Sequence, residues 1–220
     1  MVKTVEAAFE KFSKDYVKLD RNETDKALKS RDWLVQQIKT FPNKEKTFPN
    51  LYSEKNMYFG SFARKTKIKD LDDIDIMITL SAESGSYIEY SDIKRNQEAA
   101  TLKLATYKWN FDIVPCFFTK KDLNGNTHYL IPDGNGYWKK TDPRIEKSII
   151  SELNQINGGK LLDIIRIIKY WNKNSIAPTM PSYLLEIIIL NYYQDNNKLK
   201  QHISTEIYNI LNLLKKKFII

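Results

Sequence analysis

The stretch from Asp73 to Leu80 (Asp-Ile-Asp-Ile-Met-Ile-Thr-Leu) constrains the fold of this chain more than any other. Its alternating pattern is typical of a β-strand, in which side chains two residues apart share one face. We therefore expect Asp73 and Asp75 to project together, with Ile74 and Ile76 on the opposite, buried face. Two neighbouring carboxylates repel each other, and a divalent cation such as Mg²⁺ or Mn²⁺ relieves that repulsion because it prefers hard oxygen ligands. The strand therefore predicts a site for a divalent ion.

Asp112 is the third acidic residue of interest, because it interrupts an otherwise apolar strand predicted at residues 109–118. An unpaired carboxylate in such a strand would be costly. If this strand pairs beside the one that carries Asp73 and Asp75, three carboxylates converge, and such a triad can hold two divalent ions. A simpler alternative is that Asp73 and Asp75 end a strand at the surface and that Asp112 pairs with a lysine.

Gly60 and Ser61 come shortly before the paired aspartates. Glycine lets a backbone approach a phosphate closely, and the start of a helix presents free N–H groups to an anion. A Gly-Ser pair alone is common in ordinary turns, but the same pair followed by the aspartates at this spacing indicates a triphosphate site. The neighbouring cations Arg64, Lys65 and Lys67 are most simply interpreted as solvated.

The order of predicted elements indicates an α+β protein of two lobes with a cleft between them. A sheet lobe is predicted at residues 1–145 and a helical lobe at 146–220. In the first lobe we expect helices at 4–18, 22–39 and 92–107, loops at 41–50 and 81–87, the strands around the aspartates, and a hairpin turn at 124–126 that leads into a strand at 128–131. In the second lobe we expect helices at 143–156, 160–174, 182–194 and 204–217, with Pro178 and Pro181 separating the second of these from the third.

Composition narrows the classes of function without choosing one. The 220 residues carry a formal net charge of +8, which favours nucleotides, nucleic acid or an acidic partner, although solubility alone explains such a charge equally well. Cys116 is the single cysteine, so an internal disulfide is impossible and a zinc site is disfavoured. Neither a signal peptide nor a membrane-spanning stretch is evident in the sequence, so we expect a cytoplasmic protein without a membrane partner.

The combination of Gly60 to Thr66, Asp73-Ile74-Asp75 and Asp112 resembles the DNA polymerase β-like nucleotidyltransferase superfamily. Further segments look like bacterial cGAS/DncV-like nucleotidyltransferases (CD-NTases, SMODS type); these are residues 129–133, 168–172 and 181–186, with Gly136, Trp138 and 141–143. The resemblance spans roughly residues 22–190. It implies a polymerase β-like nucleotidyltransferase fold, with a mixed sheet lobe and a helical lobe.

The resemblance also implies roles for particular residues. Asp73, Asp75 and Asp112 would be catalytic and would bind two Mg²⁺ (or Mn²⁺) ions, and Asp112 would help deprotonate the attacking hydroxyl. Gly60 and Ser61 would contact the donor triphosphate, Lys169 and Ser182 would hold its phosphates, and Tyr183 would stack on its base. Two alternatives stay open: Lys169 is one more solvated lysine, and Tyr183 is a core aromatic residue of its helix.

The activity that the resemblance implies is the joining of nucleoside triphosphates into a cyclic di- or oligonucleotide messenger with release of pyrophosphate. Such an enzyme would serve antiphage signalling (CBASS) and act through a downstream effector. One rival is nucleotidyl transfer to RNA, a protein or a small molecule, and another is a non-catalytic nucleotide- or RNA-binding module. The family usually continues past the last predicted helix, so we expect the helical lobe to be incomplete at its C-terminus. No oligomeric state is predicted.

Overall fold

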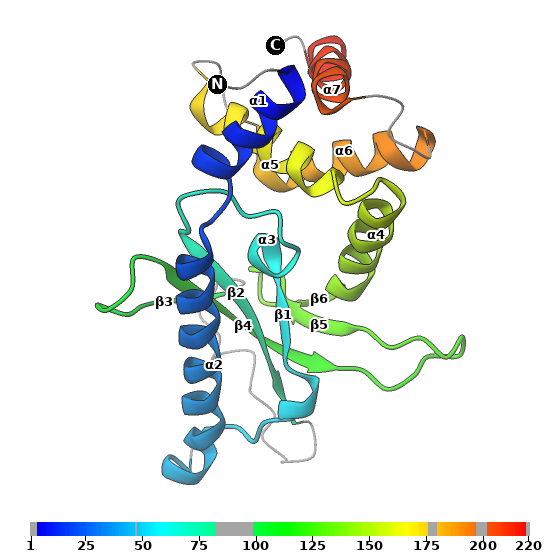
Figure 1. The fold of residues 1–220 in the computed structure, drawn as a ribbon. Coiled ribbons are helices and arrows are strands. Elements are labelled where there is room, and N and C mark those ends of the chain that lie inside the picture. Colours follow the sequence, from blue (N-terminus) through cyan, green and yellow to red (C-terminus); the bar gives the residue numbers. More distant parts are fainter. Residues whose placement is uncertain (1–3, 47, 82–98, 176–179, 197–201, 219–220) are drawn as a thin grey trace. The chain divides into compact units, whose positions relative to one another are not determined.

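The computed structural model describes residues 4–46, 48–81, 99–175, 180–196 and 202–218 (Figure 1). The chain divides into two compact units. The sheet unit comprises Asp20–Ala63 and Leu71–Arg144, and the helical unit comprises Met1–Leu19, Arg64–Asp70 and Ile145–Ile220. The helical unit therefore includes two segments from the first half of the chain, residues 1–19 and 64–70. The predicted lobes as separate domains, and the cleft between them, stay predictions.

The sheet unit contains a mixed sheet, of which six strands are described. These are β1 (Met57–Phe59), β2 (Asp73–Leu80), β3 (Ala100–Lys103), β4 (Asn110–Phe118), β5 (Tyr129–Pro132) and β6 (Trp138–Thr141). The strand order is β1-β2-β4-β5-β6, and β3 pairs with the same edge of β4 as β5 does, nearer the start of β4. The central pair β2 and β4 is parallel, whereas the other pairs are antiparallel. This parallel pair positions the predicted aspartates.

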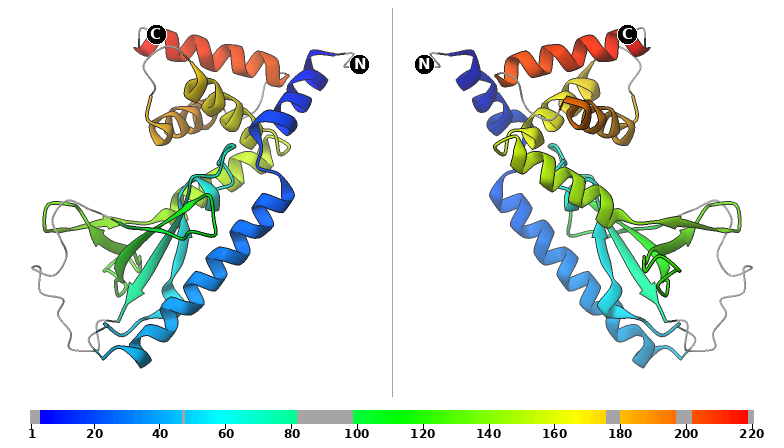
Figure 2. Two further views of the ribbon diagram at one scale, coloured as in Figure 1. Left: turned by 90° about the vertical axis from the view of Figure 1, so that its left-hand side faces the viewer. Right: turned by 90° about the vertical axis from the view of Figure 1, so that its right-hand side faces the viewer.

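Helix α2 (Arg21–Lys44) lies along one face of this sheet (Figure 2). It begins at Asp20, whose carboxylate accepts a hydrogen bond of 2.7 Å from the amide of Glu23, which is the usual way to satisfy a free N–H group in the first turn. On the packed side, the indole of Trp109 donates to the hydroxyl of Ser30 at 3.2 Å. The helix therefore braces the start of β4.

Two predicted elements of the sheet unit are wrong in part. Helix α2 continues to Lys44 instead of ending near residue 39, with Pro42 inside its last turn, where proline removes only one backbone hydrogen bond. Residues 100–103, predicted as the second half of a helix at 92–107, form β3. Pairing with the open edge of β4 outweighs the helical spacing of the apolar residues there. Residues 82–87 of the predicted loop and 92–98 of that helix lie outside the described residues.

Two short turns flank β1 and complete the sheet unit. A 3₁₀ turn at Ser53–Lys55 precedes it, and α3 (Gly60–Ala63) follows it directly. Because β1 pairs antiparallel with β2, Phe59 lies opposite Asp75. The Gly-Ser turn therefore begins beside the paired aspartates.

The helical unit consists of α1 (Val5–Phe12), a π-helical turn (Ser13–Val17), α4 (Pro143–Ile156), α5 (Leu161–Asn174), α6 (Ser182–Asn196) and α7 (Ile203–Phe218). Its core gathers apolar side chains from all of the helices from α4 onward, and the segment Arg64–Asp70 adds Ile68 to it. The helices predicted from residue 143 onward are confirmed. Pro178 lies outside the described residues. No described helix combines the length and the apolar character that crossing a membrane requires.

Candidate active site

The parallel pairing of β2 and β4 places the three predicted aspartates on one face of the sheet. Asp75 is in register with Asp112, and Asp73 is in register with Asn110. Paired residues of neighbouring strands point to the same face, as do residues two apart on one strand. On the opposite face Ile74 is 1% exposed, whereas the aspartates are half-buried. The strand neighbours predicted for Asp112 are confirmed.

A threonine hydroxyl fixes one oxygen of Asp112. Thr101 lies opposite Asp112 on β3, and its hydroxyl donates to Oδ1 of Asp112 at 2.7 Å. The simpler alternative paired Asp112 with a lysine, but the hydrogen bond that the structure shows for Asp112 comes from the hydroxyl of Thr101. The sequence did not predict this role for Thr101, because the pattern around residues 100–103 indicated a helix instead of strand β3.

The oxygen donors of this aspartate face fit a hard divalent cation. Neighbouring strands lie about 4.8 Å apart and residues two apart on a strand are roughly 7 Å apart, so carboxylates that extend from these positions are close enough to share ions that lie about 4 Å from each other. Among the described residues, however, no three His, Cys, Asp or Glu side chains are gathered into a group that could already hold a metal ion. The ligand roles of Asp73, Asp75 and Asp112 stay predictions.

Gly60 packs directly against the side chain of Asp75. Its φ of +70° lies in the region that favours glycine. A Cβ atom built on Gly60 would lie 1.7 Å from Oδ2 of Asp75 and 2.4 Å from its Cγ, so no other residue fits without moving the carboxylate. The sequence suggested glycine here for the sake of a phosphate, and the structure adds a second reason.

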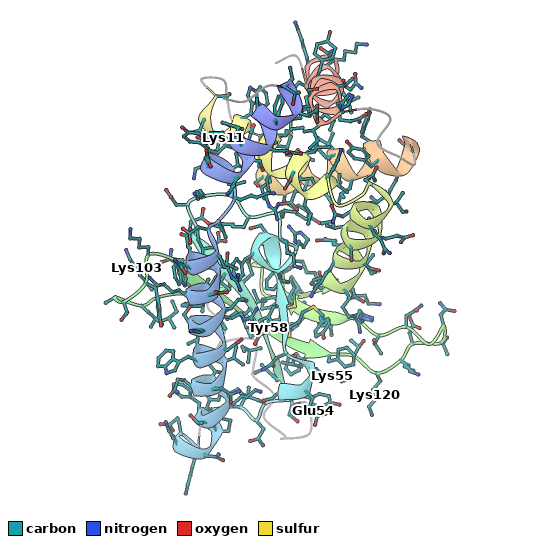
Figure 3. All side chains as sticks on the ribbon, in the orientation of Figure 1. Lys11, Glu54, Lys55, Tyr58, Lys103 and Lys120 are labelled. Carbon is teal, nitrogen blue, oxygen red and sulfur yellow. The ribbon has the colours of Figure 1, made fainter. Side chains whose placement is uncertain are left out.

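The strand that leads into Gly60 is held by α2. The guanidinium of Arg31 lies 3.8 Å from the centre of the Tyr58 ring, and the Tyr58 hydroxyl donates to Asp32 at 3.3 Å. Figure 3 labels Tyr58 on β1, with α2 beside it. Ser61 follows in α3 and is half-buried. The position of the Gly-Ser turn is thus fixed from the helix side of the sheet.

In the helical unit, Lys169 belongs to a buried ionic cluster centred on Glu186. Its Nζ donates to Oε1 of Glu186 at 2.6 Å, and the side chains of the pair are 5% and 2% exposed. The same carboxylate accepts from Nε of Arg64 at 3.1 Å and from the hydroxyl of Thr66 at 2.8 Å. The alternative that Lys169 is solvated is therefore wrong, and so is the interpretation of Arg64 as solvated.

Burial and charge act differently on the two partners of this pair. Burial raises the pKa of Glu186, but the attraction of Lys169 and Arg64 outweighs it and holds the pKa below its ordinary value. Burial lowers the pKa of Lys169 and prevails over the attraction of Glu186, and repulsion by the nearby cations Lys67 and Arg64 lowers that pKa further. A buried carboxylate held ionised by two cations makes this cluster a rigid anchor.

Tyr183 lies at the start of α6 next to the exposed Ser182 and is 52% exposed. The alternative that Tyr183 is a core aromatic residue is therefore wrong. Its hydroxyl donates to Oε1 of Glu146 at 2.5 Å, and the guanidinium carbon of Arg64 lies 5.6 Å from its ring centre. The hydrogen bond to Glu146, together with burial, raises the pKa of Tyr183 to about 12.

Known proteins resemble this chain in sequence and in fold. A probable cyclic nucleotide synthase of Bacillus cereus (strain VD146) is 40% identical over 95% of this chain and 80% of its own length. The chain belongs to the bacterial cGAS/DncV-like nucleotidyltransferases. No protein-family model matches the chain. The predicted family is confirmed, and as a member of a family of nucleotidyltransferases the chain is an enzyme, as predicted.

Solved structures of cGAS/DncV-like nucleotidyltransferases share the fold. CdnC of E. coli MS115-1, solved in a complex with HORMA-deltaN, aligns with a TM-score of 0.74 at 16% identity over 95% of this chain and 70% of that chain. The cyclic AMP-GMP synthase DncV of Vibrio cholerae aligns with a TM-score of 0.67 at 13% identity over 92% of this chain and 75% of that chain. The predicted α+β fold of the polymerase β type is confirmed.

Sequence reasoning missed two carboxylates that hold the predicted residues of the helical unit. Glu146 binds Tyr183, and Glu186 binds Lys169. A signal for Glu186 exists in the sequence, because a single acid in the apolar run Leu184 to Leu190 needs a buried partner. Glu146 stands in the polar first turn of α4 and carries no comparable signal.

Proposed function

We propose that this enzyme joins nucleoside triphosphates into a cyclic di- or oligonucleotide messenger and releases pyrophosphate. The observation that carries the proposal is the register of Asp75 with Asp112, with Gly60 packed on the Asp75 carboxylate. The name of the relative from Bacillus cereus supports the cyclic nucleotide product. As in the predicted pathway, the product would act on a downstream effector in antiphage (CBASS) defence.

In the reaction, a ribose hydroxyl of one nucleotide attacks the α-phosphorus of a second. A new P–O bond forms, the bond from that phosphorus to the pyrophosphate breaks, and Asp112 helps to accept the hydroxyl proton. Two Mg²⁺ or Mn²⁺ ions, bound by Asp73, Asp75 and Asp112, would supply charge stabilisation for the attacking and leaving oxygens. A repeat of the step within the linear product closes the ring.

The remaining predicted residues would bind the donor triphosphate. Gly60 and Ser61 would contact its phosphates with backbone and hydroxyl groups. Lys169 and Ser182 would add a positive charge and a hydroxyl, and Tyr183 would present an exposed aromatic face to the base. The exposure of Tyr183 and Ser182 is compatible with these roles. For Lys169, binding a phosphate requires it to share its charge with Glu186.

Incubation of the purified protein with each labelled nucleoside triphosphate and Mg²⁺ or Mn²⁺ tests the proposal. We expect a phosphatase-resistant product together with pyrophosphate, and loss of both in the variant with Asp73→Asn and Asp75→Asn. The matched control is Asp25→Asn, an exposed aspartate of α2. A product that persists in the double variant contradicts the proposal.

Transfer to RNA, a protein or a small molecule is the second candidate function. The observation that favours an RNA acceptor is the net charge of +8. Labelled nucleotide that appears on added RNA, and not in a small product, supports this candidate over messenger synthesis. Nucleotide binding without any pyrophosphate release supports the non-catalytic module instead.

A further inference from the structure

We propose that Glu146 is a positioning residue that orients the ring of Tyr183 for stacking against the base of a nucleoside triphosphate. This inference rests on the proposed function, because it assigns a partner to the base-stacking residue. Its evidence is a chain of side-chain contacts within the helical unit. That chain runs from the buried Glu186 through Arg64 and Glu146 to the exposed Tyr183.

The first link holds the hydroxyl of Tyr183. The phenol donates to Oε1 of Glu146 at 2.5 Å. A hydrogen bond to an ionised carboxylate is stronger than a neutral one. The same bond raises the pKa of Tyr183 to about 12, so the hydroxyl keeps its proton and donates at neutral pH. The far end of the ring is therefore fixed to α4.

The second link holds Glu146 itself. Its other carboxylate oxygen accepts from a guanidinium nitrogen of Arg64 at 3.3 Å. Arg64 in turn donates to Glu186 at 3.1 Å, and the side chains of Arg64 and Glu186 are 9% and 2% exposed. Glu146 is thus connected to a buried anchor, although its own side chain is 31% exposed. Because Arg64 is held by the buried Glu186, it restricts the movement of Glu146 and, through Glu146, of the Tyr183 hydroxyl.

The third link is the orientation of the ring. The guanidinium carbon of Arg64 lies 5.6 Å from the ring centre of Tyr183, within the range of a cation–π contact. Half of Tyr183 nevertheless stays exposed. An exposed aromatic ring with a fixed hydroxyl loses little conformational freedom when a planar ligand stacks on it, and this preorganisation favours binding.

Variants that break the same bond from either side test the inference. We expect Glu146→Ala and Tyr183→Phe each to raise the KM for the donor triphosphate roughly three- to tenfold, as loss of one hydrogen bond predicts, with kcat changed by less than about twofold. The double variant should be no worse than Glu146→Ala alone, because once Glu146 is absent the Tyr183 hydroxyl has no bond to it left to lose. Glu146→Gln should restore part of the affinity, since its amide oxygen still accepts.

The matched controls are Glu152→Ala, which removes an exposed glutamate from the same helix, and Tyr208→Phe, which removes an exposed phenol from α7. Both should leave KM unchanged. The inference is overturned if Glu146→Ala lowers the melting temperature while KM stays at the wild-type value. It is also overturned if the effects of the two single variants multiply in the double variant.

A binding measurement separates this inference from the proposed function. The dissociation constant of a non-hydrolysable ATP analogue is measured by calorimetry, without turnover. If the wild-type protein makes no product but Glu146→Ala still weakens binding, the proposed function fails and the positioning role stands. If the wild-type protein makes product and the variant binds the analogue as well as the wild type does, the positioning role fails alone.

Discussion

Gly60 combines a backbone conformation that favours glycine with direct packing against the side chain of Asp75. Because a Cβ atom there would lie 1.7 Å from Oδ2 of Asp75, Gly60→Ala must displace the carboxylate, the turn or both. Misplacement by about 1 Å can reduce catalysis by roughly 100-fold. We therefore expect pyrophosphate release by Gly60→Ala to fall about 100-fold, and steady-state kinetics measures this directly.

Gly125 supplies the matched control for this substitution. Its φ of +78° resembles that of Gly60, but nothing lies within 4 Å of the Cβ position. Gly125→Ala therefore carries the same backbone strain, about 1 kcal/mol, without the overlap. We expect it to lose some stability and to keep its activity. Equal activity of the two variants would show that the contact between Gly60 and Asp75 has no catalytic importance.

Individual residues were predictable to the extent that local pattern determines them. The face of Asp73 and Asp75 follows from strand alternation, and the glycine requirement follows from the turn. By contrast, the partners of Lys169 and Tyr183 belong to other helices, 17 and 37 residues away, so no spacing rule within one helix could pair them. Arg64 was misjudged for the same reason, because two carboxylates from α4 and α6 bury it.

At the scale of elements, the N-terminus of helix α7 is capped by the side-chain carboxylate of Glu6 from α1. Glu6 accepts from the amides of Ile203 and Ser204 at 3.1 and 3.3 Å and from the Ser204 hydroxyl at 2.8 Å. A carboxylate that satisfies free N–H groups at a helix start contributes about 1 kcal/mol. We expect Glu6→Ala to lower the free energy of unfolding by about 1–2 kcal/mol in urea denaturation. Glu10→Ala, an exposed change on the same helix, should stay within about 0.5 kcal/mol of wild type.

We expect acid to reduce the stability that the ion pair between Lys169 of α5 and Glu186 of α6 contributes. The pKa of Glu186 is held below its ordinary value of 4.5 by Lys169 and Arg64, against the effect of burial. A depressed carboxyl pKa contributes stability that is complete above the ordinary value and is lost as the pH falls through the lower, folded value. Glu186→Gln leaves two buried cations without this carboxylate, a change that costs about 3–5 kcal/mol at neutral pH.

The measurement is the unfolding free energy of wild type and of Glu186→Gln between pH 7 and pH 3. We expect the gap between them to narrow as the pH falls below about 4.5, because the unfolded chain then binds a proton that the folded Glu186 carboxyl, with its lower pKa, does not yet bind. Glu152→Gln on α4 controls for the loss of a glutamate as such. A gap that stays constant down to pH 3 would mean that Glu186 is not held ionised by its partners.

Elements whose period is uninterrupted were the most predictable ones. The helices from residue 143 onward follow their apolar spacing, whereas β3 exists because the edge of β4 offers it hydrogen-bond partners. Apolar residues at helical spacing cannot reveal such an edge, since it is created by the pairing of β2 with β4. The same pairing explains why the predicted helix around Thr101 was wrong.

At the scale of the whole molecule, the positive charge is unevenly distributed. The sheet unit contains 17 Lys and Arg residues and 17 Asp and Glu residues, while the helical unit contains 18 and 10. The entire net charge of +8 therefore belongs to the helical unit. A polyphosphate ligand should be attracted to that unit, and salt should screen the attraction.

Nucleotide affinity is therefore expected to depend on ionic strength. We expect the dissociation constant of ATP to rise about three- to tenfold between 0.05 and 0.5 M KCl, because the screening length falls well below 10 Å in that range. Adenosine lacks the phosphates and serves as the control ligand, whose affinity should stay nearly constant. An ATP affinity that is as insensitive to salt as that of adenosine would contradict a role for this charge in binding.

Mass spectrometry tests the proposed reaction most directly. The products formed from ATP, GTP, CTP and UTP with Mg²⁺ are compared for wild type, Asp112→Asn and Asp25→Asn. We expect a cyclic nucleotide product from wild type and from Asp25→Asn, and none from Asp112→Asn, because Asp112 shares one face of the sheet with Asp73 and Asp75. The same cyclic product from Asp112→Asn, or no product from any of the three proteins, would contradict the proposed reaction.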